Sequence, residues 1–201
     1  MDLGWGVLQR TADAFGWEEA IEVPLRVTPS RLPADPNAPQ VAMSSIGQFD
    51  VRTTPLQMAM VASAIGNDGV LMKPYLVQVA RAPDLSVIES TKPEVYKTSM
   101  SAQNAQLLQR MMVGVVENGT GAAARIPGIE VAGKTGTAET GLDTAPHTWF
   151  VAFAPAEDPV IAIAVVVENG GSLGGDGTGG AVAAPIAKAV MQARLEQVGL
   201  R

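Results

Sequence analysis

The sequence contains no cysteine and a single histidine, His147, in its 201 residues. Without cysteine the chain can form no disulfide, no thiol nucleophile and no cysteine-ligated zinc site. No glutamate stands at a metal-ligating spacing from the histidine, so we expect no metal site. His147 lies beside Trp149, just before an expected strand, and is expected to be a loop residue rather than a general base.

A basic cluster and a long apolar run are also lacking. The net charge is −6, and no group of lysines and arginines is available to neutralise phosphates, which argues against a nucleic-acid partner. No segment approaches the roughly 20 apolar residues of a membrane helix, and the first residues lack the basic and apolar regions of a signal peptide. With 47% apolar residues, the chain is expected to form one domain around one sizeable core.

The most informative segment that is present, residues 128–140, fits two catalytic signatures. Read from Gly128, GIEVAGKT fits the phosphate-binding pattern G-x-x-x-x-G-K-[ST]; read from Lys134, KTGT fits the K-T-G element of penicillin-recognising serine enzymes. A phosphate loop needs small residues between its glycines and a helix that begins at the lysine. Here β-branched residues alternate before the lysine and helix breakers follow it, so we expect a strand over 128–138. A nucleotide hydrolase is kept as a remote alternative.

On a strand, Thr135 and Thr137 project to one face, and Lys134 and Gly136 project to the other. Two hydroxyls and the backbone N–H of Thr137 then line one wall of a cleft, with Gly136 allowing close approach from behind and Lys134 adding a charge. Such a wall suits a carboxylate and can supply an oxyanion-stabilising donor. An ordinary surface strand with a solvated lysine is the competing interpretation of these residues alone.

Further segments occur in an order that resembles a known family. They are Ser45–Gln48, Thr54–Ala59, Val115–Gly121, Val131–Glu139 and Trp149–Pro155. Together they resemble the C-terminal part of a class B penicillin-binding protein transpeptidase domain, most like the actinobacterial penicillin-binding protein A group, from about Gly4 to Leu195.

This resemblance implies an α/β (α+β) fold in which helices flank an antiparallel sheet. It also implies a peptidoglycan D,D-transpeptidase that cross-links stem peptides through an acyl-serine and is acylated by β-lactams. Lys134 would take part in proton handling, Thr135, Gly136 and Thr137 would bind substrate, and the Thr137 N–H would face the oxyanion. Gly47 and Gln48 belong to the family signature and are assigned a structural role.

The family's nucleophile lies in an S-x-x-K motif followed by S-x-N, and neither motif occurs at any of the nine serines. We therefore expect residues 1–201 to be the C-terminal portion of a single transpeptidase domain, inactive alone. The resemblance places the complete protein at the extracytoplasmic face of the bacterial membrane, anchored by an N-terminal segment absent from this chain. The chain would associate with that missing part or with itself. A noncatalytic ligand-binding or interaction module of the same fold is the alternative.

Local signals predict the remaining elements. Thr54 followed by proline and glutamine predicts a capping box that opens a helix ending near Gly66, and Ser101 caps another helix that ends at Asn118. The glycine-rich segment 170–180 is expected to be a flexible surface connection. Further helices are expected over about 3–15 and 182–198, and a hairpin over about 148–168.

Overall fold

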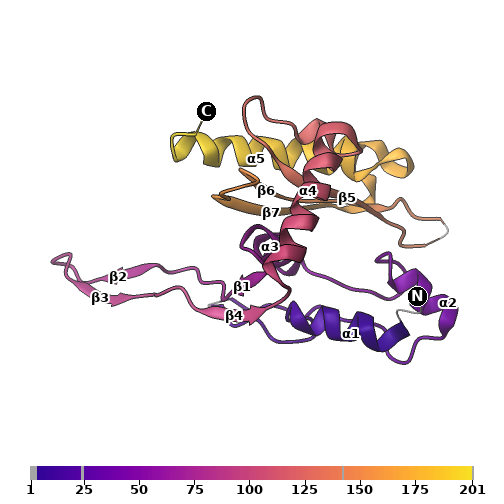
Figure 1. The fold of residues 1–201 in the computed structure, drawn as a ribbon, viewed down its shortest axis with the longest axis horizontal. Coiled ribbons are helices and arrows are strands. Elements are labelled where there is room, and N and C mark those ends of the chain that lie inside the picture. The colour runs from indigo at the N-terminus through magenta and orange to yellow at the C-terminus, as the bar shows by residue number, and fades with distance from the viewer. Residues whose placement is uncertain (1–3, 24, 142, 201) are drawn as a thin grey trace.

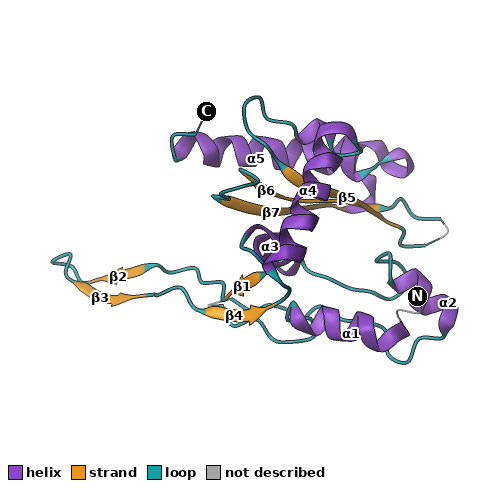
Figure 2. Ribbon diagram, viewed as in Figure 1, coloured by secondary structure: helices purple, strands orange, loops and turns teal. Residues whose placement is uncertain are grey.

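A computed structural model describes residues 4–23, 25–141 and 143–200. In chain order the elements are α1 (Gly4–Ala14), α2 (Ala38–Ser44), α3 (Pro55–Gly66), β1 (Val70–Met72), β2 (Val79–Arg81), β3 (Val87–Ser90), β4 (Val95–Thr98), α4 (Ala102–Asn118), η1 (Ala122–Ala124), β5 (Ala132–Ala138), β6 (His147–Ala154), β7 (Ile161–Val167), η2 (Glu168–Asp176), η3 (Gly179–Ala183) and α5 (Ala184–Gln197). The expected helix start at Leu3 lies outside the described residues. Figure 1 shows the arrangement, and Figure 2 separates helices from strands.

The main sheet has the order β5-β6-β7, and both pairs are antiparallel. β5 begins at Ala132, so the expected strand over 128–138 is wrong in its first four residues. Gly128 has φ +78°, and the N–H of Ile129 donates to the carbonyl of Ile126 at 3.1 Å. Glycine reaches positive φ at little cost, so the chain can form a tight turn at Gly128. This turn comes just before β5, and the residues whose alternation predicted an earlier start of the strand lie in it or directly after it.

Helices cover both faces of the sheet, α5 on one and α3 with α4 on the other (Figure 1). Phe150 lies in the cluster that includes Met191 and Leu195 of α5. Phe153, three residues further along β6, packs with Ala62 of α3 and Met112 of α4. Successive strand side chains point to opposite faces, so these two buried phenylalanines anchor the two layers.

Helix α3 begins as expected but uses its glutamine differently. The Thr54 hydroxyl accepts from the N–H of Gln57 at 3.1 Å, and Pro55 occupies the first turn. The Gln57 carboxamide does not return to Thr54; it donates to the carbonyl of Phe15 at 2.8 Å and is buried. The expected capping box is therefore wrong here, because tertiary packing draws the glutamine to the end of α1. A complete capping box occurs at α2, between Asn37 and Gln40.

The glycine-rich segment 170–180 is exposed over 171–173 and at 175, 176 and 178, as a surface connection would be, but three of its glycines are packed against neighbouring backbone or side chains. Gly170, Gly177 and Gly179 are buried. A Cβ atom at Gly179 would stand 2.2 Å from the carbonyl oxygen of Trp149, so only glycine fits there. α5 then starts at Ala184, after the π-turn of η3.

Below the sheet, a second core joins Phe15 and Ile21 to Met60 of α3 and Leu71 of β1. β2 and β3 form a separate antiparallel pair that projects from this layer as an arm (Figure 2). No helix within the described ranges is both long and apolar enough to cross a membrane.

Candidate active site

The residues Lys134 to Thr137 lie on β5, at one edge of the sheet. Within the described part of the chain β5 pairs only with β6, so its other edge is open. Lys134 is exposed, and its Nζ donates to the carbonyl oxygen of Thr135 at 2.6 Å. The amine thus lies along the open edge and carries a positive charge there.

Thr135 pairs in register with Phe150, whose side chain packs on the layer formed by α5. Its hydroxyl oxygen lies 2.7 Å from the hydroxyl oxygen of Thr120. Thr120 follows Gly119, the residue that ends α4. Sequence analysis used this segment as a helix end and as part of the family resemblance, and it gave Thr120 no role at the site; a threonine between two glycines was the available signal that the residue has a fixed place.

Thr137 is exposed near the end of β5, and its carbonyl oxygen accepts a hydrogen bond from Gln48. The Nε2 to oxygen distance is 3.2 Å, and the two residues are 89 positions apart in the sequence. Gln48 follows Gly47, which has φ +78° just beyond α2. The residue that we expected to be structural therefore lies at the site and tethers the loop after α2 to β5.

Gly136 is enclosed from both sides of the strand. A Cβ at this position would stand 3.2 Å from the Cβ of Trp149, its partner on β6. On the other side, a Cβ built on Gly179 would come within 2.9 Å of the Gly136 nitrogen. The backbone between the two threonines is thus held by contact, which is the rigidity that a preorganised binding edge requires.

His147 is the first residue of β6 and not a loop residue, so that expectation is wrong. It pairs with Ala138, and its Nδ1 accepts from the N–H of Asn169 at 3.1 Å. This bond fixes the start of the glycine-rich segment, where Asn169 has φ +53°. Glu139 and Asp143, beyond the strand, are exposed.

The phosphate-loop alternative is contradicted by the position of Lys134. The lysine lies inside β5, and a strand, not a helix, continues to Ala138. No helix N-terminus is present there to receive a phosphate.

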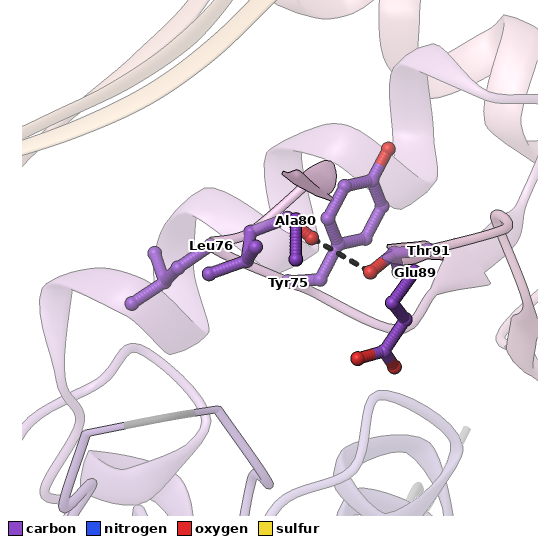
Figure 3. Close-up of a pocket in the computed structure, with 6 residues that line it drawn as sticks. Tyr75, Leu76, Ala80, Glu89 and Thr91 are labelled. Carbon is purple, nitrogen blue, oxygen red and sulfur yellow. Dashed lines mark hydrogen bonds between the residues drawn. The ribbon is translucent and has the colours of Figure 1, made fainter. Parts of the chain in front are cut away.

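Other polar features lie away from this edge. A surface pocket of ≈ 220 Å³ at the β2–β3 arm is lined by Tyr75, Leu76, Val77, Ala80, Glu89 and Thr91, and the Thr91 hydroxyl donates to the Val77 carbonyl at 2.6 Å (Figure 3). Among the described residues, no three acidic or histidine side chains converge to hold a metal ion.

The Glu19 carboxylate accepts hydrogen bonds from Tyr96 and Lys97, and these bonds shift pKa values in the group. The hydrogen bond from Lys97, with a further one from Tyr96, lowers the pKa of Glu19. Burial and the bond to Glu19 raise the pKa of Tyr96 to about 12. This cluster joins the end of α1 to β4 and does not involve β5.

Comparisons with known proteins identify the family of the chain. The family model described as penicillin binding protein transpeptidase domain matches residues 8–192. Peptidoglycan D,D-transpeptidase PbpA of Mycolicibacterium smegmatis is 45% identical over 98% of this chain and 40% of its own length. The protein of the same name from Mycobacterium tuberculosis is 43% identical over 96% of this chain and 40% of its own length. The chain thus spans about two fifths of the length of these relatives.

The fold matches as well. The solved structure of penicillin-binding protein A from M. tuberculosis, a ceftriaxone acyl-enzyme complex, superimposes with a TM-score of 0.88 at 44% identity, covering 96% of this chain and 44% of that one. The helix and sheet arrangement described above is therefore that of a portion of a transpeptidase domain. Because the family model matches most of its residues, the chain belongs to the penicillin-binding protein transpeptidase domain family.

Proposed function

We propose that this chain forms the carboxylate- and oxyanion-binding wall of a peptidoglycan D,D-transpeptidase. The observation that carries the proposal is the Lys-Thr-Gly-Thr sequence on the open edge of β5. An open strand edge can receive an extended peptide as an added strand, and peptide stems are the substrates of this reaction. The names of the relatives support the same activity.

The two threonines of β5 bind the terminal carboxylate of the stem peptide through their hydroxyls. Thr135 and Thr137 are two positions apart on one strand and so share a face. Gly136, held between Trp149 and Gly179, fixes the backbone between them and leaves the ligand to approach along the open edge of the strand, where the charge of Lys134 attracts the carboxylate. No cofactor or metal is needed for these interactions.

The N–H of Thr137 serves as an oxyanion donor. In an antiparallel pair, the N–H and C=O of one residue point to the same side of the strand. The Thr137 carbonyl is reached by Gln48 from outside the β5–β6 pair, which supports an outward direction for the Thr137 N–H as well. Removing one donor of this kind costs roughly 10²–10³ in rate in enzymes where it has been tested.

In the complete reaction, a serine of an S-x-x-K segment attacks the penultimate D-alanine carbonyl. That segment is not among these 201 residues. The serine loses its proton to the lysine network, to which Lys134 contributes, and the terminal D-alanine leaves after its nitrogen is protonated. An amine of a second stem peptide then attacks the acyl-serine, forms the new amide and restores the serine. A β-lactam acylates the same serine because it mimics the substrate.

The missing part of the protein completes the domain at β7. β7 is the other edge of the sheet, and all seven of its residues, Ile161–Val167, are apolar and half-buried. We infer that this edge pairs with a strand of the nucleophile-bearing segment or with a second copy of the chain. The complete protein acts at the extracytoplasmic face of the membrane, held by an N-terminal anchor outside this chain.

A noncatalytic ligand-binding or interaction module of the same fold is the second candidate, and the presence or absence of an S-x-x-K segment in the full-length protein discriminates between the two. It would use the same edge of β5 to hold a ligand without acylation. The two candidates differ in one property, because only the enzyme forms a covalent adduct with a β-lactam once a nucleophile is supplied.

Labelled penicillin and intact-protein mass spectrometry test the proposal. We expect no adduct on this chain alone and a stoichiometric adduct on the full-length protein that contains it together with an S-x-x-K segment. Lys134→Ala in that protein should slow acylation, whereas Lys188→Ala, on α5, should not. A full-length protein that carries the motif and takes up no penicillin would favour the noncatalytic module.

A further inference from the structure

Thr120 occupies a position that the surrounding backbone fixes closely. The N–H groups of Gly119 and Gly121 both donate to the carbonyl of Val115, at 3.1 and 3.0 Å, which folds the chain back over the end of α4. A Cβ at Gly180 would stand 2.2 Å from the Thr120 carbonyl oxygen. Gly119 and Gly121 are restricted to a smaller degree, since added Cβ atoms would stand 2.9 Å from the Val115 carbonyl oxygen and 3.2 Å from the Phe150 ring. The close packing at Gly119, Gly121 and Gly180 therefore holds Thr120 against β5.

The hydroxyl of Thr120 faces only one described hydrogen-bond partner, the hydroxyl of Thr135 at 2.7 Å, and either oxygen can be the donor. Each hydroxyl has one proton to donate and two lone pairs to accept with. A carboxylate only accepts. When Thr135 donates its proton to a bound carboxylate, the bond between the threonines can persist only if Thr120 is its donor.

We propose that Thr120 is a positioning residue that donates to Thr135 and thereby directs the Thr135 proton at the substrate carboxylate. This inference rests on the proposed function, in which Thr135 binds that carboxylate. Without Thr120, the Thr135 hydroxyl loses the bond that selects its orientation and polarises its proton. The substrate class assigned to this contact is a ligand with a free carboxylate next to the reactive carbonyl.

The test compares two ligands on the full-length protein that supplies the nucleophile: a penicillin and its methyl ester, which lacks the negative charge. Thr120→Val keeps the volume of the side chain and removes its proton. We expect it to lower the acylation rate constant for the acid about tenfold, the size of one hydrogen bond to a charged group. The rate constant for the ester should change by less than about twofold, because the ester makes no charge-assisted bond there.

Matched variants separate positioning from folding. Thr120→Ser keeps the hydroxyl and should restore the acid rate. Thr144→Val removes a hydroxyl from the exposed pair Thr140 and Thr144, whose oxygens are 2.8 Å apart, and should change neither rate. Thr135→Val should reproduce the effect of Thr120→Val, and the double variant should add no further loss, since both act through one contact.

Unchanged acid rates in Thr120→Val, or equal losses for acid and ester, would overturn the role of Thr120. Should Thr120→Val fail to fold, the acid-to-ester ratio of acylation rate constants in Thr120→Ser, which keeps the donor, is compared with the ratio in Thr120→Ala, which removes it. Equal ratios for those two would also overturn it. If the unsubstituted protein is not acylated by either ligand, the proposed function itself fails and the inference falls with it.

Discussion

At the scale of single residues, the candidate site depends on side chains that reach β5 from other parts of the chain. Thr120 lies against Thr135, and Gln48 donates to Thr137. Each contact fixes one of the two residues that the proposed function assigns to the ligand. The site is thus supported by hydrogen bonds from outside the strand as well as by the strand itself.

Thr137→Val should impair acylation of the full-length protein by penicillin more than it impairs folding. The substitution removes a hydroxyl from an exposed position and nearly preserves volume, so we expect about a tenfold loss in rate constant with little change in melting temperature. Stopped-flow measurement with a fluorescent penicillin gives the rate. Thr98→Val, at the exposed last residue of β4, is the control, and a normal rate in the Thr137 variant would remove that hydroxyl from the binding wall.

The Glu19 cluster should make stability depend on acid pH. Because the pKa of Glu19 in the folded state lies below its ordinary 4.5, the unfolded chain binds the proton more tightly. The stabilisation is therefore complete above pH 4.5 and is lost as the pH falls through the folded-state pKa.

Urea unfolding measures this dependence. At neutral pH, Glu19→Gln should be less stable than the unsubstituted chain, and the difference should shrink in acid once the carboxylate is protonated. Glu117→Gln, exposed on α4, should show no such pH-dependent difference. A difference that is constant across the pH range would mean that the charge of Glu19 is not the cause.

At the scale of elements, the glycine-rich segment supports the site from behind. Gly179→Ala would place a methyl group 2.2 Å from the Trp149 carbonyl, and the resulting shift should cost about 1–3 kcal/mol of stability, as overpacking does. Gly175→Ala is the matched control, since a Cβ there meets nothing within 4 Å. Thermal unfolding of both variants checks the prediction, and equal melting temperatures would contradict it.

Periodicity and capping rules predicted the positions of helices and strands, but they did not predict the tertiary contacts that the residues of these elements make. The alternation around Lys134 predicted the strand, and Thr54 and Ser101 were predicted as helix caps, because these signals are local. Gln57 could not be assigned from its spacing alone, since Phe15, 42 positions away, offers its carboxamide a buried acceptor.

The site contacts were missed for a similar reason. Thr120 and Thr135 are 15 positions apart, and Gln48 and Thr137 are 89 apart. A local pattern carries no information on such pairs. The sequence does contain the glycines that allow these two contacts, such as Gly119, Gly121 and Gly47. Which part of the backbone packs against each glycine is known only from the folded structure.

At the scale of the whole molecule, the open apolar edge of β7 should cause association. Sedimentation at micromolar concentration should show self-association or aggregation of the isolated chain, because an unpaired apolar edge strand templates pairing. Val166→Lys should reduce it, since a lysine on an edge opposes pairing.

Val190→Lys adds the same charge on α5, where Val190 is 47% exposed, and should leave association unchanged. Cooperative melting of each variant shows that the fold is retained. A stable monomer of the unsubstituted chain, with no dye-accessible apolar surface, would mean that the sheet needs no further strand.

The β2–β3 arm has a practical use as a point of attachment for a probe. Its tip is a turn in which Asp84 accepts from the Ser86 N–H at 3.0 Å, and Leu85 beside it is 71% exposed. Exposed turn tips of this kind tolerate inserted sequence. The arm projects from the layer below the main sheet. It extends away from the side of the molecule on which β5 ends (Figure 1). A fluorophore or affinity tag placed at the tip would therefore report on the protein in cells while leaving the ligand edge free.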